Sequence, residues 1–524
     1  MQTDYDAIIV GAGINSLACA VHLGAKGWRV GVFEQAAVPG GAVKTVELTE
    51  PGFRHDWAAM NLSLFAGSGF FKVYGEDLVG RGLEFAPASH CFASVFDDGK
   101  WMGVSTGAGE TRARIAAFSE ADAKAWDRLC SEFPGTAEYV FALLGNPMQM
   151  QVQGKLLAKA LFRKGFAWTA DLVRMLLSSP RKWLTETFES EHVRTTMAAW
   201  GMHLDFAPDM AGGAVFPYLE SMANQNFGMV IGKGGADTVT RALVSKIEAS
   251  GGEVHCGSQV ARVVREGSKA TGIELADGSR IKANKAVIAN VAPRGLMSLI
   301  EGQSGDAGFD RKMTGFVHAP GTMMIHLALD GLPDWSASDE LKSFAYVHIA
   351  PSLDQMARTY QQAVAGLLPD EPVLVVGQPT VVDPSRAPEG KHVLWVQVRM
   401  VPGEIRGDAA GKITETDWAQ AKELYAERAL DIIERHAPGI RQKIIGRTVV
   451  SPLDLEADNP NLVGGDQVAG SHHLSQNFLF RPALGHATGK TPVEGLHITG
   501  ASVWPGAGTG AGAGYMLAQK LGGK

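Results

Sequence analysis

Two close glycines and a downstream acid near the start of the chain have the types and spacing of a dinucleotide site. Gly11 and Gly13 follow a short apolar run, and Ser16 takes the third small position of the turn. Glycines permit a tight turn and let backbone N–H groups approach a pyrophosphate at a helix N-terminus. Glu34 ends the next apolar run, where an acid can bind a ribose hydroxyl pair. The pattern predicts a dinucleotide-binding turn.

Two further glycine-rich segments extend this pattern. Gly40 and Gly41 follow Glu34 directly. Near the other end of the chain, the apolar run 496–499 ends at Gly500, and a glycine-rich loop precedes a helix expected from about Gly510. N–H groups at that helix start could meet a second electron-rich part of the same ligand. The preceding strand and the following helix argue against the alternative of a flexible glycine tail.

The elements that must position these residues follow from apolar periodicity and turn residues. We expect a first strand–helix–strand unit over 4–45 and mostly helices over 110–200, with Ser119 and Asp122 resembling a capping box. An Asp277-Gly278 turn predicts a hairpin. The remaining expected elements are a helix over 236–250, strands over 254–265, 273–275, 286–289 (ending at Asn290), 322–329 and 392–400, and a helix over 415–437.

Composition sets broad limits. The chain has 524 residues, 45% hydrophobic and 20% charged, which is typical of a globular protein with several domains. A net charge of −7 gives no reason to expect a nucleic-acid partner. Four scattered cysteines predict neither a disulfide framework nor a zinc site, and we expect no metal. With no long apolar run and a first strand starting near Tyr5, we expect a cytoplasmic protein.

The three glycine-bearing segments, in this order, resemble the FAD-binding parts of the phytoene desaturase-like oxidoreductases, which are related to the amine oxidase flavoproteins. The resemblance runs nearly the whole length and is most specific over 6–45, 228–292 and 481–518. It implies FAD as cofactor. The residues that it implies for cofactor binding are Gly11, Gly13, Ser16, Glu34, Gln35, Gly40, Gly41, Ala42, Val260, Asn290, Gly500, Ala501, Gly508, Thr509, Gly510 and Ala511.

Four residues are candidates for chemistry beside the cofactor. Arg481, in an Arg-Pro pair shared with the family, could stabilise a reduced, anionic flavin or an anionic substrate, and the alternative is a structural ion pair. His472 could act as acid or base, and its neighbour His473 would point to the opposite face of a strand, making a poor metal clamp. Two departures from the family pattern give the others: Trp504 as a neighbour of the flavin, and Asp56 as an acid.

The implied fold class is α/β: a Rossmann-like FAD-binding domain split by insertions, with an α+β substrate domain made of a mixed sheet and a helical cap around 110–200. We expect residues 1–70, 226–300 and 485–524 to form the discontinuous FAD-binding domain. Residues 71–225 and 301–484 are expected to form the substrate domain. No second glycine turn follows a clear strand, so we expect no separate NAD(P) domain.

The expected function is an FAD-dependent dehydrogenase or desaturase that removes two electrons from a lipophilic or amphipathic small molecule and passes them to dioxygen, a quinone or another acceptor. Three alternatives stay open. They are a flavin-dependent isomerase or saturase of the same fold, an amine oxidase, for which we find neither a ring-side lysine nor an aromatic cage, and a non-catalytic lipid-escort protein.

Residues 150–185 are basic and amphipathic. Seven Lys or Arg residues stand against one acid, Asp171, among apolar positions placed near one helical face: Leu157, Leu161, Trp168, Leu172 and Met175. Such a surface suits an anionic membrane interface, so we expect possible peripheral contact with the inner face of a membrane. The alternative is a helical cap with a solvated basic side.

Overall fold

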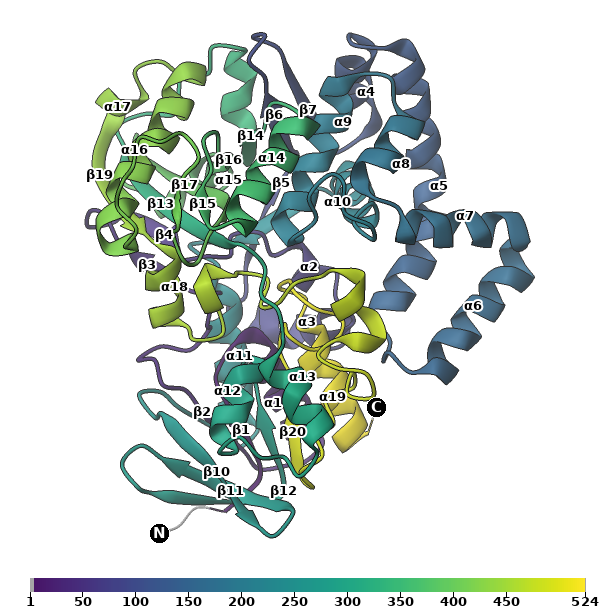
Figure 1. Cartoon of the computed structure of the whole chain (residues 1–524), viewed down its shortest axis with the longest axis vertical. Helices are drawn as coiled ribbons and strands as arrows, with labels where there is room; N and C mark the ends of the chain where they lie inside the picture. The colour runs from purple at the N-terminus through teal and green to yellow at the C-terminus, as the bar shows by residue number, and fades with distance from the viewer. Residues whose placement is uncertain (1–3, 524) are drawn as a thin grey trace.

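The computed structural model describes residues 4–523. Its two main sheets lie one beyond the other along the long axis of the molecule (Figure 1). The first sheet consists of β1 Tyr5–Val10, β2 Val30–Phe33, β9 Glu253–His255, β10 Val260–Glu266, β11 Lys269–Leu275, β12 Arg280–Ala289 and β20 Leu496–Ile498. Its order is β10-β11-β12-β1-β2-β9, and β20 also pairs with β12. The central strands are parallel, whereas β10 and β11 add an antiparallel hairpin.

Helices cover both faces of the first sheet, which explains why β1 is a continuous apolar run. Ala7 and Ile9 point to one face and pack against four helices: α1 Ile14–Ala25, α3 Gly69–Gly80, α11 Asp237–Ala249 and α19 Gly512–Gly522. Ile8 and Val10 point to the other face and pack against α12 Pro293–Leu299 and α13 Ala307–Thr314. Burial on both faces fixes the position of the turn that follows β1.

The second sheet has the order β19-β13-β17-β16-β14-β6-β7. One face packs on a long helix, α16 Trp418–His436, through aliphatic side chains of alternate strand positions. The other face lies under the helical region and carries more polar and aromatic side chains. The strands are β6 His90–Val95, β7 Trp101–Ser105, β13 Gly321–Leu329, β14 Tyr346–Ile349, β16 Val373–Gly377, β17 His392–Val401 and β19 Ile444–Val450.

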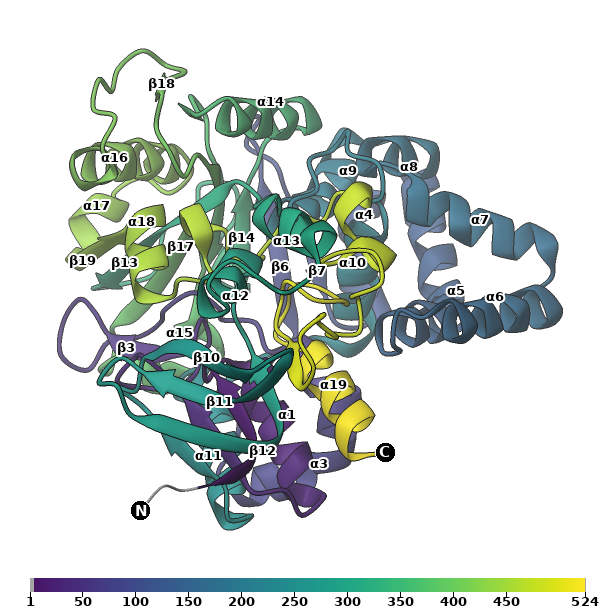
Figure 2. The ribbon, with the colours of Figure 1, turned by 60° about the horizontal axis from the view of Figure 1, so that its bottom comes forward.

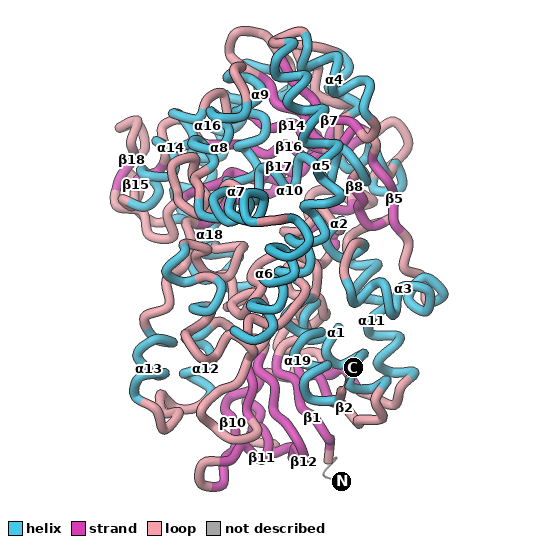
Figure 3. The backbone as a smooth tube through the Cα atoms, turned by 90° about the vertical axis from the view of Figure 1, so that its right-hand side faces the viewer, coloured by secondary structure: helices cyan, strands magenta, loops and turns pink. Residues whose placement is uncertain are grey.

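The helical region is formed by one continuous part of the chain. It contains α4 Ala108–Ala116, α5 Glu120–Leu144, α6 Met150–Lys164, α7 Phe166–Leu177, α8 Pro180–Thr187, α9 Glu191–Ala198, the 3-10 helix η1 Ala199–Leu204 and α10 Val215–Phe227. Helices α6 and α7 project from the body of the molecule as a separate arm (Figure 2). A view from that side places the arm in front of the remaining helices (Figure 3).

Short elements complete the chain. Two small antiparallel pairs, β3 with β4 and β5 with β8, connect the regions of the two sheets. The bounds are β3 Thr45–Glu47, β4 Arg54–Asp56, α2 Ser63–Ala66, β5 Phe85–Ala88, β8 Met229–Gly232, η2 Asp339–Ser343, α14 Leu353–Val364, β15 Leu367–Leu368, α15 Pro379–Val382, η3 Pro384–Arg386, β18 Gly407–Asp408, α17 Ile440–Lys443, α18 Pro452–Asp458, η4 Val463–Gly465, η5 Leu474–Gln476 and η6 Phe478–Phe480.

The α/β fold with a Rossmann-like sheet and a second mixed sheet confirms the expected class. Two local expectations were wrong. The strand expected over 254–265 is two strands, because a turn at Gly257 (φ 66°) separates β9, which pairs with β2, from β10, which pairs with β11. The capping box is only half formed. The Ser119 side chain accepts from the Asp122 amide at 3.2 Å, but the Asp122 carboxylate accepts from the amides of Glu189 and Ser190 instead.

A third expectation, one apolar helical face over 150–185, was also wrong. The segment folds as three helices, because Gly165, at φ 85°, ends α6 and precedes α7. Leu172 and Met175 pack against the helical core, whereas Leu157 and Leu161 are 47% and 41% exposed. The division into FAD-binding and substrate domains stays a proposal about how the chain is partitioned.

Candidate dinucleotide site

The glycine turn links β1 to α1, and Gly11 and Gly13 have no side chains of their own that would cover its backbone N–H groups. Gly11 adopts φ 86°, and its N–H donates to the Phe33 carbonyl at 2.7 Å, which ties the turn to the end of β2. Helix α1 has no side-chain cap and no acid in its first turn. The positive end of its dipole and its first N–H groups are therefore available to an anion.

Gly40 closes the other side of this turn. Its N–H donates to the Ala12 carbonyl at 2.9 Å, and it forms an isolated bridge with Gly13. At φ 124°, a Cβ on Gly40 would lie 2.4 Å from the Val43 carbonyl oxygen. Only glycine is compatible with this close approach of two backbone segments.

Glu34 lies at the carboxyl end of β2 and is 9% exposed. Its two carboxylate oxygens accept from the backbone amides of Ala12, at 2.6 Å, and Ala36, at 2.9 Å. These bonds orient the carboxylate and leave lone pairs for further donors, such as the hydroxyls of a ribose. The arrangement matches the ribose-binding acid predicted from the sequence.

A cavity of about 340 Å³ joins these features. Its walls come from the glycine turn, from β10 and the end of β12, and from the C-terminal loop, so segments far apart in sequence meet there. The expected cofactor-binding residues that line it are Gly11, Gly13, Glu34, Gln35, Gly40, Gly41, Ala42, Val260, Asn290, Ala501, Gly508 and Thr509.

Four of the expected cofactor-binding residues lie outside the lining, three of them directly behind it. The Ser16 hydroxyl accepts from Asn290 Nδ2 at 2.8 Å. Gly500, at φ 102°, packs so closely that a Cβ would lie 2.0 Å from Asn290 Oδ1. Ala511 is the N-cap of α19, and Gly510 lies against the Leu64 backbone. Ser16 and Gly500 therefore hold Asn290, which does line the cavity.

Arg481 does not reach the cavity. It is fully buried, and its guanidinium donates to the backbone carbonyls of residues 468–471 and of Ala501. Burial lowers the pKa of Arg481 to about 10, so it stays a cation at neutral pH. The Arg481 guanidinium thus links the loop 468–471 to the loop at Ala501 through hydrogen bonds, and its N–H donors already have partners.

His472 is buried beside Arg481. Its Nε2 accepts from the Ala507 amide at 3.2 Å, so the ring supports the C-terminal loop from behind. Burial, assisted by the Arg481 charge, holds the pKa of His472 well below its usual range. The imidazole is therefore neutral at pH 7, which does not suit the role of a general acid.

Trp504 points away from the cavity. It is 2% exposed, its ring stacks on Phe478 at 5.3 Å, and Nε1 donates to the Asn146 carbonyl at 3.0 Å. It borders a separate small cavity of about 60 Å³. The structure thus places Trp504 as an anchor between the helical region and the C-terminal loop, where the sequence suggested a neighbour of the flavin.

Asp56 links three elements of the structure through hydrogen bonds. It is 2% exposed and accepts from Arg386 Nη1 at 2.5 Å, from the Thr45 hydroxyl at 2.8 Å and from the Ala236 amide at 2.8 Å. These partners come from η3, β3 and the start of α11. Asp56 is enclosed by these donors and does not line the cavity, so the structure does not present the acid suggested by the sequence to a ligand there.

The sequence missed one wall of the cavity. Residues 458–462, Gln467 and Ala469 line it, together with Lys44. Lys44 Nζ lies 2.5 Å from an Asp458 oxygen and 5.1 Å from the Trp57 ring centre, and it is 9% exposed. Asn461 donates to the Asn290 carbonyl at 3.0 Å. The only signal in the sequence was a turn-forming Asn-Pro-Asn stretch at 459–461.

Gln467 connects the cavity to the polar face of the second sheet. Its Oε1 accepts from Gln397 Nε2 at 2.7 Å and from Arg399 at 3.5 Å. Arg399 is buried and donates to the carbonyls of residues 202 and 203 at the end of η1. The His203 and His348 rings follow, with their Nε2 atoms 3.1 Å apart. A chain of polar contacts therefore runs from the dinucleotide cavity across the sheet.

Glu220, on α10, is close enough to the ring of Tyr346 on β14 to raise the pKa of its hydroxyl. Burial alone raises the pKa of Glu220 to about 7, and no neighbouring charge or hydrogen bond of the described chain offsets this. Nothing in the sequence distinguished this acid from the others.

One group of residues has ligand atoms close enough to hold a metal ion within the described chain: His90, Glu110 and Glu340. Both glutamates already pair with Arg114. The cation occupies the centre of the group, which makes it an ion-pair cluster at the surface.

The fold and the glycine turn define a Rossmann-like, dinucleotide-binding protein. A family model described as NAD(P)-binding Rossmann-like domain matches residues 9–75. The chain is 26% identical to pyridine nucleotide-disulfide oxidoreductase domain-containing protein 2 of Rattus norvegicus, over 99% of this chain and 93% of that protein. It is 23% identical to the neurosporene-forming phytoene desaturase of Cereibacter sphaeroides, over 96% of this chain and 91% of that protein.

Among solved structures, a double mutant of putrescine oxidase is similar in fold, with a TM-score of 0.62 at 14% identity, covering 99% of this chain and 98% of that chain. The chain is thus similar over nearly its whole length to phytoene desaturases, and similar in fold to an amine oxidase. A flavin or NAD(P) dinucleotide is the class of cofactor that these similarities and the matched domain indicate. Within residues 4–523, no helix has the length and apolarity required for a membrane crossing.

Proposed function

We propose that this protein is an FAD-dependent dehydrogenase or desaturase acting on a lipophilic or amphipathic small molecule. The observation that carries the proposal is the cavity whose walls include both the N-terminal glycine turn and the C-terminal loop 501–509. A long dinucleotide with a large second ring system suits a site with walls from both segments. The ribose-binding acid at Glu34 disfavours a cofactor with a 2′-phosphate, because two negative charges would meet there.

The chain's own residues have distinct roles in this proposal. The bare backbone at Gly11 and Gly13 and the uncapped start of α1 bind the pyrophosphate, and Glu34 binds the adenosine ribose. Ala501, Thr509 and Gln467, which line the same cavity, would contact the ring end of the cofactor. When bound, FAD supplies a two-electron acceptor for the substrate's hydride equivalent. Residues 1–70, 226–300 and 485–524 together form the cofactor domain in this proposal.

The face of the second sheet under the helical region is the proposed substrate side. It is reached from the cavity through Gln467, and its aromatic residues Tyr346 and Trp395 lie in one apolar cluster with Trp200 of η1. Apolar and aromatic side chains suit a lipophilic substrate, and the polar groups of this face would orient it. The names of the desaturase relatives support the same class. The electrons removed from the substrate would leave to dioxygen, a quinone or another diffusible acceptor.

The test starts with the absorption spectrum of the purified protein and an FAD titration. We expect a yellow protein, or a colourless one that takes up FAD stoichiometrically. Anaerobic addition of lipophilic candidates should bleach the flavin in the presence of the true substrate. A protein that binds neither FAD nor its fragments would overturn the proposal.

Three other outcomes of these experiments would support one of the alternative functions. Bleaching by simple amines with peroxide formation in air would indicate an amine oxidase. A product with the same oxidation state as the substrate, or a more reduced one, would indicate an isomerase or a saturase. Lipid binding by a colourless protein that rejects FAD would indicate an escort protein.

A further inference from the structure

The arm formed by α6 and α7 has an apolar surface that no other part of the described chain covers. The two helices have 15 and 12 residues, yet Ala160 is the only buried residue of the first and Thr169 of the second. A helix on the surface of a globular protein normally buries one apolar stripe against the core. Here large apolar side chains stay in contact with solvent.

Exposure is greatest at the tip of the arm. Phe162 is 93% exposed and Phe166 is 80% exposed, on either side of the Gly165 turn. Leu157, Val173 and Leu177 are 47%, 39% and 55% exposed. Single exposed apolar residues are common, but a contiguous patch on a projecting element marks an interaction site.

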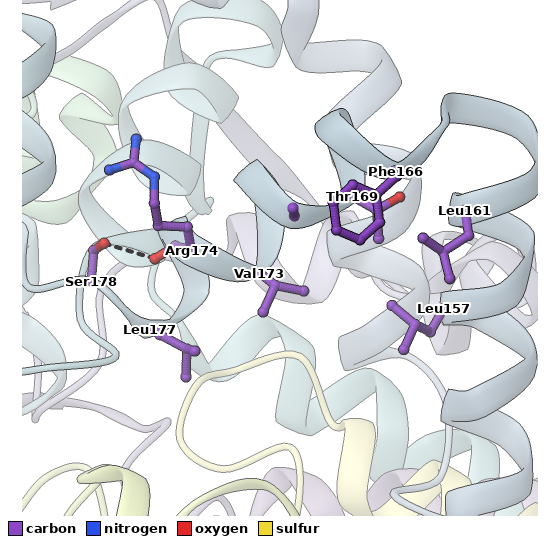
Figure 4. Close-up of a pocket in the computed structure, with 9 residues that line it drawn as sticks. Leu157, Leu161, Phe166, Thr169, Val173, Arg174, Leu177 and Ser178 are labelled. Atoms are coloured by element: carbon purple, nitrogen blue, oxygen red, sulfur yellow. Dashed lines mark hydrogen bonds between the residues drawn. The ribbon is translucent and has the colours of Figure 1, made fainter.

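These exposed side chains, apart from Phe162, line a groove between the two helices. Its volume is about 600 Å³, and Leu157 and Leu161 from α6 face Phe166 and Val173 from α7 across it (Figure 4). Arg174 and Ser178 lie at its end, where the Ser178 hydroxyl donates to the Arg174 carbonyl at 2.7 Å. Few other polar groups line the groove, so it offers no pattern of donors and acceptors to a polar ligand.

The charges around the groove are almost all positive. Helices α6 and α7 carry five Lys or Arg residues and one acid, Asp171, in a chain whose net charge is −7. Lys159 pairs with Glu138 and Arg174 with Glu186. Lys155 and Arg163 are exposed and form no ion pair among the described residues. Two cations beside the most exposed apolar side chains are thus available to an outside anion.

These observations distinguish between possible occupants. A second copy of the arm would bring two positively charged faces together, which is unfavourable. A bilayer containing anionic lipids offers an apolar interior to the phenylalanines and a negative surface to the cations. We propose that the α6–α7 arm docks on an anionic lipid surface, with Phe162 and Phe166 inserted among the acyl chains and Lys155 and Arg163 at the headgroups.

The proposal is tested by flotation with vesicles of phosphatidylcholine, with and without phosphatidylglycerol. We expect the protein to bind the anionic vesicles and to be released by salt, because exposed charges are screened. The double variant Phe162→Ser/Phe166→Ser should lower the partition coefficient by about tenfold or more. The variant Lys155→Glu/Arg163→Glu should remove the preference for phosphatidylglycerol.

Phe227→Ser is the matched control, because Phe227 is 69% exposed on α10, in the body of the molecule. It should bind vesicles as well as the unaltered protein. Circular dichroism and FAD uptake check that every variant is folded, so a failure of the cofactor proposal is distinguishable from a failure of this one. Absence of binding to anionic vesicles at low salt overturns the proposal. So does a dimer that Phe162→Ser/Phe166→Ser separates, since a second copy would then cover the arm.

Discussion

At the scale of single residues, the Glu34 carboxylate does two things at once. It holds the amides of Ala12 and Ala36, and it presents its remaining lone pairs to the cavity. The first interaction stabilises the folded turn, and the second is available only to a ligand. A glutamine keeps the shape but has a single acceptor oxygen, so it weakens both contributions: the charge is lost, and its NH2 group faces one of the two amides.

We predict that Glu34→Gln weakens FAD binding by about tenfold and lowers the free energy of unfolding by about 1 kcal/mol, because one of the two backbone hydrogen bonds is lost. Hydrogen bonds to a charged acceptor contribute about 1 kcal/mol more than bonds to a neutral one, and about 1.4 kcal/mol is a tenfold change in Kd. Quenching of FAD fluorescence on titration measures it. Glu253→Gln, at a carboxylate that pairs with Arg29 away from the cavity, should not change the Kd. Equal Kd values for Glu34→Gln and the unaltered protein would contradict the assignment.

Glu220 makes the free energy of unfolding fall as the pH rises, which is opposite to the usual effect of a carboxyl group. Its pKa is raised from 4.5 to about 7 in the folded protein, so the folded state binds the proton more tightly than the unfolded state. The contribution of Glu220 protonation to the free energy of unfolding is fully present below about pH 4.5 and is lost as the pH rises through 7. Most other carboxyl groups with shifted pKa values, such as Asp334 and Glu274, are shifted downward.

We therefore predict that Glu220→Gln stabilises the protein at about pH 8, by roughly 1 to 3 kcal/mol, and has little effect at about pH 5. The difference in free energy of unfolding between variant and unaltered protein, from urea titrations at both pH values, measures it. Other titrating groups cancel in this difference. A difference that does not change with pH would show that Glu220 is not enclosed as the structure describes.

At the scale of elements, α1 and α19 approach each other closely although they come from opposite ends of the chain. The Gly514 amide donates to Asn15 Oδ1 at 3.0 Å, and a Cβ at position 514 would lie 1.9 Å from the Asn15 carbonyl oxygen. The contact lies in the first turn of α1, where the proposed pyrophosphate site begins. Small changes in helix spacing should thus reach the cofactor site.

We predict that Gly514→Ala lowers the free energy of unfolding by about 2 to 3 kcal/mol, since an added methyl group must separate the helices. FAD affinity should fall with it. Gly154→Ala on α6 is the control, because a Cβ there meets nothing within 4 Å. That substitution should be neutral or stabilising by up to about 1 kcal/mol. Equal effects of both substitutions in thermal and urea unfolding would contradict the close packing of α1 and α19.

The local fold of residues 5–34 was predictable from the sequence, because the strand, the glycine turn and the acid lie within a single strand–helix–strand segment. Their roles toward a dinucleotide stay predictions. Sequence reasoning failed where the decisive fact is which way a side chain points after packing. Arg481 and Trp504 stood at suggestive positions, yet both point into protein and bind carbonyls. The cavity wall formed by the loop 458–469 could not be predicted from the sequence, because only the tertiary structure brings that loop to β1.

At the scale of the whole molecule, the cavity is lined by segments that lie far apart in the sequence. A ligand that contacts Glu34, Asn461 and Thr509 together binds the folded state and not the unfolded chain. Binding should therefore stabilise regions far from the glycine turn.

We predict that FAD at 100 times its Kd stabilises the protein by about 2.7 kcal/mol and protects the loop 458–469 from proteolysis. NAD⁺ at the same concentration should give a smaller effect, because it cannot engage the C-terminal loop in the same way. Differential scanning fluorimetry and limited proteolysis measure the two effects. Stronger stabilisation by NAD⁺ than by FAD would reverse the proposed cofactor.

The pairing of β20 with β12, and of α19 with α1, has a consequence for how the protein is made. Residues 496–522 leave the ribosome long after the first glycine turn, because more than 450 residues separate them in the sequence. Until they emerge, one edge of β12 is unpaired and the apolar face of α1 lacks its neighbour. Coenzyme binding is thus expected only after residues 496–522 have folded onto β12 and α1, and the intermediate that precedes this step exposes apolar surface.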